Sequence, residues 1–401
     1  MGTLTFFATL EKFMRSGINA AFYFWIATII DKESFGLLTV MLASLAFFTP
    51  LLAGGLEAHS VATFLTLKDQ NQLEHKMLEI STLLTIYSII FFCIILIFYK
   101  YNEISIFILL VTGLPLALSR YYDSNRYLEY ANFAVKKNLI IDYAGIVLSS
   151  LLKLLAIQNP DNLVEYVLLI IIFDMYSNSL IRLVLSKNIK YMRYVKVPKT
   201  LVSTSVILIF AGLLQAGFTK IDLIMVPIIF DKSMAAGYGF SIRIFDIFMI
   251  LTSVISSFLP GYIKKISTTT AGFNLKLMRT GLKISVPLLL LTFISKYPIE
   301  FILTKYLIDY LPSFNALFGL FLWLPILSLI GSINNFILLS HDRARVITIN
   351  AGICFVINVI LNYLLSVPFG MTGFAISTII CCGLNSIVLP AISFRVLKIK
   401  L

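Results

Sequence analysis

The feature that most constrains this chain is its succession of long apolar stretches, separated only by short polar turns. Segments such as 83–99 and 104–118 contain no charged residue. Hydrophobic residues make up 59% of the chain and charged residues 13%, whereas soluble domains average about 45–50% and 25%. An apolar run of about 20 residues spans a bilayer as a helix. The sequence therefore predicts an all-α integral membrane protein.

About twelve spanning helices are predicted, because the apolar runs break at charged or Gly/Pro-bearing turns. The first run carries Glu11, Lys12 and Arg15, and no small-residue cleavage site follows Trp25. It is therefore expected to be a spanning helix and not a cleavable signal peptide. The predicted ranges are 3–29, 34–66, 77–99, 103–123, 132–157, 162–186, 199–230, 234–263, 275–295, 310–340, 344–366 and 370–394.

The distribution of basic residues predicts the topology. Most of the 32 Lys and Arg residues fall in alternate turns, on the side that also holds both chain ends. By the positive-inside rule this side is cytoplasmic, so both termini are expected inside a bacterial cytoplasmic membrane. A basic excess sorted in this way indicates topology and argues against a nucleic-acid partner. The four Cys residues show neither a disulfide framework nor a metal-ligand spacing, and no metal or other cofactor is expected.

Short similarities suggest that the chain is an internal duplication. Asp31-Lys32 follows the first predicted helix, and Asp231-Lys232 follows the seventh. The segment 141–146 of the fifth helix likewise matches 349–353 of the eleventh. We therefore expect two six-helix lobes, 1–195 and 196–401, joined at the basic stretch 187–199. Six is even, so the repeats have the same orientation, which suits alternating access with a substrate site between the lobes.

Several charges fall within predicted spans. A charge near the bilayer centre costs roughly 2.5–3.5 kcal/mol, so such residues usually face a cavity or a partner. Because the basic members outnumber the acidic ones that lack a local partner, the cavity is expected to be positive and to attract an anion. The predicted substrate-binding residues are Arg15, Arg120, Lys153, Lys220 and Arg243, and the acidic candidates for H⁺ or Na⁺ coupling are Asp174 and Asp222.

Structural roles remain open for some of these residues. Arg15 can pair with Glu11 and Arg243 with Asp246, since both pairs have helical spacing. Lys153 lies near an outer helix end and can extend to the headgroups. Lys220 and Asp222 are two residues apart and so point to different faces of one helix. Tyr23 and Tyr238 can stack on sugar rings, or belong to an interfacial aromatic belt.

Two carboxy-terminal segments carry a family resemblance. The first combines Asp222, Gly237-Tyr238, Arg243 and Pro260. The second runs from Asn358 and Asn362 through 368–378, with Pro-x-Gly-x-x-Gly-x-Ala-x-Ser-Thr spacing. Both resemble the polysaccharide flippase family, as does Gly55-Leu56-Glu57 in the amino-terminal half.

This resemblance implies an O-antigen or capsule flippase related to multidrug antiporters. Such a protein exports undecaprenyl-pyrophosphate-linked repeat units through a cationic cavity with ion coupling, and it can work beside a polysaccharide polymerase. Asp222 and Arg243 match positions of the family pattern, whereas Gly239, Phe240 and Ser377 depart from it.

Three other functions fit this sequence less well. A multidrug antiporter of the same architecture is expected to have a more acidic cavity, because its usual cargo is cationic. A major-facilitator transporter is disfavoured, since the loop 68–76 lacks that family's glycine-and-arginine signature. A membrane polymerase or glycosyltransferase needs a substantial outer loop, but the longest one here, about 296–309, is short. An enzyme is therefore not expected.

Overall fold

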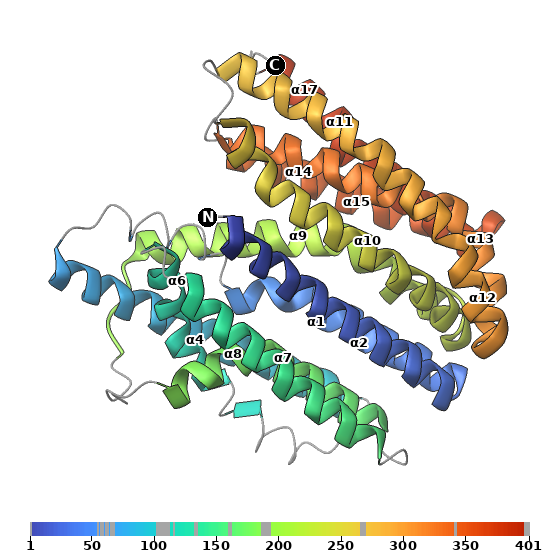
Figure 1. Ribbon diagram of the computed structural model, residues 1–401, viewed down its shortest axis with the longest axis horizontal. Coiled ribbons are helices and arrows are strands. Elements are labelled where there is room, and N and C mark those ends of the chain that lie inside the picture. The colour runs from blue at the N-terminus through green and yellow to red at the C-terminus, as the bar shows by residue number, and fades with distance from the viewer. Residues whose placement is uncertain are drawn as a thin grey trace. The chain divides into compact units, whose positions relative to one another are not determined.

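The computed structural model describes residues 2–396, apart from 54–55, 57–59, 61–63, 65–68, 102–112, 115–116, 132–134, 159–162, 186–193, 265–269 and 341–342. All regular structure in these residues is helical (Figure 1). Ten of their helical stretches are long and apolar enough to cross a membrane. The predicted all-α membrane fold is confirmed, and the protein is a multi-pass membrane protein. The count of twelve spans and the side on which the termini lie stay predictions.

Some predictions concern residues outside this description. Most of the predicted span 103–123 is among them, as are much of the junction 187–199 and most of the Gly54–Glu57 motif.

Contacts divide the chain into two compact units. The amino-terminal unit comprises Met1–Ile18 and Leu45–Leu213. Helix α7 packs against α8 in this unit (Figure 1), and an apolar core around Leu83, Leu84 and Ile209 joins α4 to the first part of α9. The unit contains parts of α1 (Gly2–Ile29), α2 (Lys32–Ala53) and α9 (Lys199–Ile229), together with α4 (Gln70–Tyr101), η1 (Arg120–Tyr122), α6 (Asp123–Ala131), α7 (Val135–Ile157) and α8 (Leu163–Leu185).

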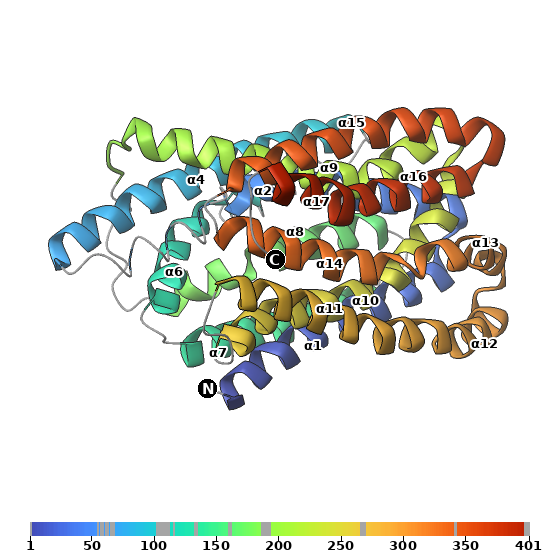
Figure 2. The same cartoon turned by 90° about the horizontal axis from the view of Figure 1, so that it is seen from above.

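The carboxy-terminal unit comprises Asn19–Ser44 and Leu214–Leu401. Helices α15 and α16 run side by side in it, as Figure 2 shows, and α10 packs against α13 and α14. Its further elements are α10 (Lys232–Lys264), α11 (Thr270–Ile294), α12 (Lys296–Tyr306), η3 (Ile308–Tyr310), α13 (Leu311–Phe321), α14 (Leu324–Ser340), α15 (Ala344–Phe369), α16 (Met371–Gly383), the π turn η4 (Leu384–Val388) and α17 (Leu389–Val396).

The end of α1 and the start of α2 therefore pack with the carboxy-terminal helices. A Cβ added to Gly36 would lie 1.9 Å from the Lys232 carbonyl oxygen, and one added to Gly239 would lie 2.1 Å from Thr39 Cγ2. Glycine at these two positions thus allows α2 and α10 to approach each other closely. The lobe boundary predicted at 195/196 separates two sequence repeats. The division into compact units does not test this boundary, so it stays a prediction.

The two similar turns noted in the sequence have the same local structure. Asp31 accepts a hydrogen bond from Ser34 N at 2.9 Å at the start of α2, and Asp231 accepts one from Met234 N at 2.6 Å at the start of α10. Each carboxylate is thus an N-cap, and the hydrogen bonds from Ser34 lower the pKa of Asp31 below its ordinary value. The shared geometry is what an internal duplication predicts.

Two helices lie where turns were expected. The segment 296–309, predicted to be an outer loop, forms α12 and η3, and α6 follows the predicted end of the fourth span. Both are short. The predicted single span 310–340 is divided into α13 and α14 near Trp323, and 370–394 contains the π turn η4 between α16 and α17. Hydropathy averages over such local breaks, so it does not reveal them.

Candidate functional site

Two cations share one carboxylate in the carboxy-terminal unit. Lys220 Nζ on α9 lies 3.1 Å from Asp246 Oδ1 on α10, and Arg243 Nη1 lies 3.6 Å from Asp246 Oδ2. The Arg243 guanidinium also lies 5.0 Å from the centre of the Tyr23 ring. All three charged side chains are partly accessible, between 23% and 32%. The cluster of Lys220, Arg243, Asp246 and Tyr23 is named the α9–α10 cluster below.

The charge balance of the α9–α10 cluster is positive. One carboxylate cannot neutralise two cations, so one positive charge remains uncompensated by the described residues of the cluster. The predicted pairing of Arg243 with Asp246 is confirmed, and Lys220 joins the same carboxylate. An accessible Lys and Arg held side by side provide donors suited to a phosphate or a carboxylate.

A second, fully buried group lies on the other face of α9. Asp222 is 1% exposed. Its Oδ2 accepts hydrogen bonds from Tyr238 OH at 2.7 Å and from Thr378 Oγ1 at 3.1 Å, and its Oδ1 accepts one from Leu223 N at 2.8 Å. Lys220 and Asp222 thus reach different partners, as their spacing predicted.

The Asp222 group differs from the α9–α10 cluster in kind. Among the described residues its hydrogen-bond partners are neutral donors, and no ion pair joins it to a basic side chain. A buried carboxylate charge without a cation is costly, so a bound proton or metal cation would stabilise this group. Tyr238 has no exposed surface, which fits neither of its two sequence-based interpretations, the interfacial aromatic belt and the stacking on sugars. Tyr23 lies instead beside the accessible Arg243.

Each basic candidate of the amino-terminal unit has its own acidic partner. Arg15 Nε donates to Glu11 Oε1 at 2.9 Å, as predicted from their spacing. Lys153 Nζ lies 2.9 Å from Asp174 Oδ2, and with 6% exposure it does not extend to the headgroups. Arg120 pairs with Asp123 and lies 5.6 Å from the Tyr176 ring centre.

Several partners in this unit were missed by sequence reasoning. Asp123 binds Arg120, and Glu129 on α6 pairs with both Arg182 and Lys137. Asp142, which the sequence marked only as a repeat position, accepts a hydrogen bond from Asn178 Nδ2 at 2.6 Å. A carboxylate inside an apolar run was the available signal for Asp142. The local helix α6, which carries Glu129, gave no signal in hydropathy.

Among the five predicted basic candidates, the positive excess therefore lies at Lys220 and Arg243. Arg15, Lys153 and Arg120 are each balanced by a carboxylate, and their predicted role in substrate binding remains a proposal. Asp174 is likewise occupied by Lys153, which leaves Asp222 as the acidic candidate without a salt bridge among the described residues.

Comparisons with known proteins give a fold. No family model matches the chain and no curated protein matches its sequence. Among solved structures, an inward-facing multidrug resistance MATE family transporter of the MOP superfamily aligns with a TM-score of 0.68 at 11% identity, over 96% of this chain and 95% of that one. The lipid II flippase MurJ, in an inward closed conformation, aligns with a TM-score of 0.64 at 15% identity, over 98% and 87%.

A third match is a MOP superfamily transporter from Pyrococcus furiosus, whose report describes a reverse polarity of its binding pocket. It aligns with a TM-score of 0.60 at 11% identity, over 98% of this chain and 96% of that one. The chain thus has the fold of these membrane transporters. This fold houses both a lipid flippase and multidrug transporters, so it does not select a substrate.

The pair of buried Lys153 and partly buried Asp174 allows a test of whether an ion pair between two helices has a structural role. Removing one member of a buried pair leaves the other charge unpaired and typically costs about 3–5 kcal/mol, whereas replacing both costs much less. We expect Lys153→Met and Asp174→Leu each to lower the unfolding temperature in detergent strongly, and the double variant to recover most of the loss. Lys137→Met serves as control, because Lys137 is an exposed partner of Glu129. Two small, additive losses would contradict a structural pair.

Proposed function

We propose that the protein is a flippase for an undecaprenyl-pyrophosphate-linked oligosaccharide, an O-antigen or capsule repeat unit. It moves this lipid from the inner to the outer leaflet of a bacterial cytoplasmic membrane by alternating access. The observation that carries the proposal is the accessible α9–α10 cluster, in which Lys220 and Arg243 share the single carboxylate of Asp246.

The chemistry of a pyrophosphate fits this cluster. Arg donates two parallel hydrogen bonds to phosphate oxygens, and Lys adds a compact charge. Tyr23 lies against Arg243, and such an aromatic contact fixes a guanidinium while its edge can still donate. The pyrophosphate binds Lys220 and Arg243, the first sugars follow it, and the prenyl tail stays in the lipid. The lobes then rock to release the head group outside.

An ion-coupled multidrug antiporter is the second candidate. The specific observation in its favour is Asp246, an accessible carboxylate able to bind a cationic drug, together with the MATE family structures that share the fold. The two candidates assign opposite roles to one ion pair. In the flippase Lys220 binds the substrate and Asp246 only orients Lys220, whereas in the antiporter Asp246 binds the cargo. A membrane polymerase or glycosyltransferase is not proposed.

Substitutions at Lys220 and Asp246 separate the two candidates. Each variant is expressed in a strain that lacks the gene. The readout is the labelling of lipid-linked repeat units on the outer face by a membrane-impermeant sugar label. The wild-type gene should restore labelling. Lys220→Ala should reduce it about 10- to 100-fold, since a hydrogen bond to a charged group contributes about 1.5–3 kcal/mol. Lys220→Arg and Asp246→Asn should retain it.

Lys199→Ala is the matched control, because Lys199 is an exposed lysine in the first turn of the same helix. Protein levels are compared throughout. Full labelling by Lys220→Ala at normal protein level would contradict the flippase. Loss of drug efflux in Asp246→Asn, with repeat units unaffected by gene deletion, would establish the antiporter. Repeat units that reach the outer face of the deletion strain but stay unpolymerised would indicate an assembly enzyme.

Asp222 is proposed as the site of the coupling ion, which is H⁺ or Na⁺. The support is its complete burial among the neutral donors Tyr238 and Thr378. A proton or Na⁺ neutralises the carboxylate charge when it binds. A change in that charge favours one arrangement of α9, α10 and α16, the helices that carry Asp222, Tyr238 and Thr378, over another. Asp174 is the alternative candidate, but Lys153 already neutralises it.

Asp222→Asn keeps the shape of the side chain and removes its charge. In vesicles we expect transport by the wild type to respond to an imposed H⁺ or Na⁺ gradient, and transport by Asp222→Asn to lose that response. Asp174→Asn is the comparison at the other acidic candidate. The ion whose gradient matters identifies the coupling ion. Gradient dependence that survives in Asp222→Asn but disappears in Asp174→Asn would reverse the assignment.

The proposed partners follow from this function. They are the lipid-linked oligosaccharide, the surrounding membrane lipid and a polysaccharide polymerase that uses the exported unit. No nucleic acid and no metal cofactor beyond a coupling Na⁺ is proposed.

A further inference from the structure

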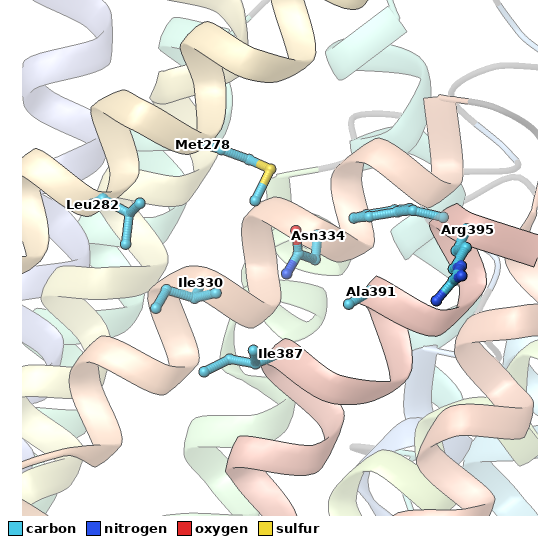
Figure 3. Close-up of a pocket in the computed structure, with 8 residues that line it drawn as sticks. Met278, Leu282, Ile330, Asn334, Ile387, Ala391 and Arg395 are labelled. Atoms are coloured by element: carbon cyan, nitrogen blue, oxygen red, sulfur yellow. The ribbon is translucent and has the colours of Figure 1, made fainter. Parts of the chain in front are cut away.

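A pocket of about 480 Å³ lies in the carboxy-terminal unit, apart from the charged groups described above (Figure 3). Its apolar walls come from α11, α14 and the segment η4–α17, through Met278, Leu282, Ile330, Ile387 and Phe394. The volume lies within the roughly 300–1,000 Å³ of typical small-molecule sites.

The π turn η4 shapes one wall. A Cβ added to Gly331 on α14 would lie 2.6 Å from Ser386 Oγ, so glycine lets α14 approach the turn closely. The Ser386 carbonyl then accepts a hydrogen bond from Asn334 Nδ2 at 2.6 Å. Single π turns inside helices are frequent at functional sites. This arrangement holds the Asn334 amide at the pocket.

Asn334 presents an unused acceptor there. The residue is 4% exposed, and its Oδ1 is buried without a hydrogen-bond partner among the described residues. A buried acceptor left unpaired costs about 1–3 kcal/mol. A ligand with a hydroxyl donor would remove this cost, which an apolar chain alone cannot do.

The pocket opens on a surface suited to lipid, with a basic rim. Leu282 and Ile387 are 53% and 47% exposed, as expected of side chains that face acyl chains in a membrane protein. Arg395, in the last turn of α17, lines the same pocket. Arg279, next to Met278 on α11, is exposed at the same end, which the positive-inside rule assigns to the cytoplasmic leaflet.

We propose that this pocket binds one anionic phospholipid of the cytoplasmic leaflet, with a hydroxyl-bearing head group of the phosphatidylglycerol type. An acyl chain fills the apolar pocket, the phosphate binds Arg395, and a head-group hydroxyl donates to Asn334 Oδ1. Basic residues at the cytoplasmic side of membrane helices are suited to anionic lipid head groups. The proposal does not depend on which substrate the protein transports.

The test uses the full-length protein, exchanged in detergent with phosphatidylglycerol or with phosphatidylcholine, which is zwitterionic and lacks a hydroxyl donor. Retained lipid is counted by native mass spectrometry. We expect one phosphatidylglycerol per chain, retained about tenfold better than phosphatidylcholine, because only phosphatidylglycerol adds a hydroxyl hydrogen bond to Asn334 Oδ1 and because Arg395 repels the choline cation. Arg395→Gln should lower the retention of phosphatidylglycerol and reduce this preference.

Ala391→Phe should fill the pocket and abolish retention of the lipid. Val388→Phe is the matched control, because Val388 belongs to η4 and is 43% exposed but does not line the pocket. Equal retention of both lipids by the wild type would overturn the proposal, as would equal retention by the two Phe variants. Retention of undecaprenyl phosphate in place of phosphatidylglycerol would assign the pocket to the substrate lipid and also overturn it.

Discussion

The sharing of one carboxylate by two cations is the interaction on which the functional account depends. A charge inside a membrane protein is tolerated when it has a partner or faces water. Asp246 gives Lys220 and Arg243 a common partner without cancelling both. The arrangement keeps two basic side chains in place and leaves a positive charge accessible. The basic candidates of the amino-terminal unit, such as Lys153 beside Asp174, each have an acidic partner and give no comparable excess.

Asp222 complements the α9–α10 cluster because it lies on the same helix but is wholly buried. Lys220 reaches α10 through Asp246, and Asp222 reaches α10 through Tyr238 and α16 through Thr378. A change in the charge of Asp222 would therefore act on the helices that also position Lys220. This proximity along α9 offers a direct physical route by which the proposed coupling ion would influence the proposed substrate site.

The fold was largely predictable because its main determinant, the length and hydropathy of each apolar run, can be read along the sequence. Apolar runs of sufficient length must become helices in a bilayer, and hydropathy reads them directly. The similar caps at Asp31 and Asp231 were also visible as matching residues. Three local features could not be predicted in this way: helix α12, the break between α13 and α14, and the π turn η4. Each depends on packing against neighbouring helices and leaves the average hydropathy unchanged.

The site was predicted only in part, because pairing between helices cannot be read from spacing along one helix. The pairs Glu11–Arg15 and Arg243–Asp246 have helical spacing and were predicted. Lys153–Asp174, however, joins two helices, and the sequence had placed these residues in different roles. Asp123 went unconsidered as a partner for Arg120, although it lies only three residues away, because it fell at a predicted helix end.

The binding of an anionic substrate by the α9–α10 cluster is tested most directly with lipid ligands that differ only in charge, bound to the purified protein in nanodiscs. We expect a pyrophosphate-linked prenyl oligosaccharide to bind more tightly than the same oligosaccharide on an uncharged prenol. This preference should weaken with added salt, because salt screens accessible charges, and it should vanish in a Lys220→Ala/Arg243→Gln variant. Equal affinity for the two lipids, or tighter binding of a cationic drug, would contradict the account.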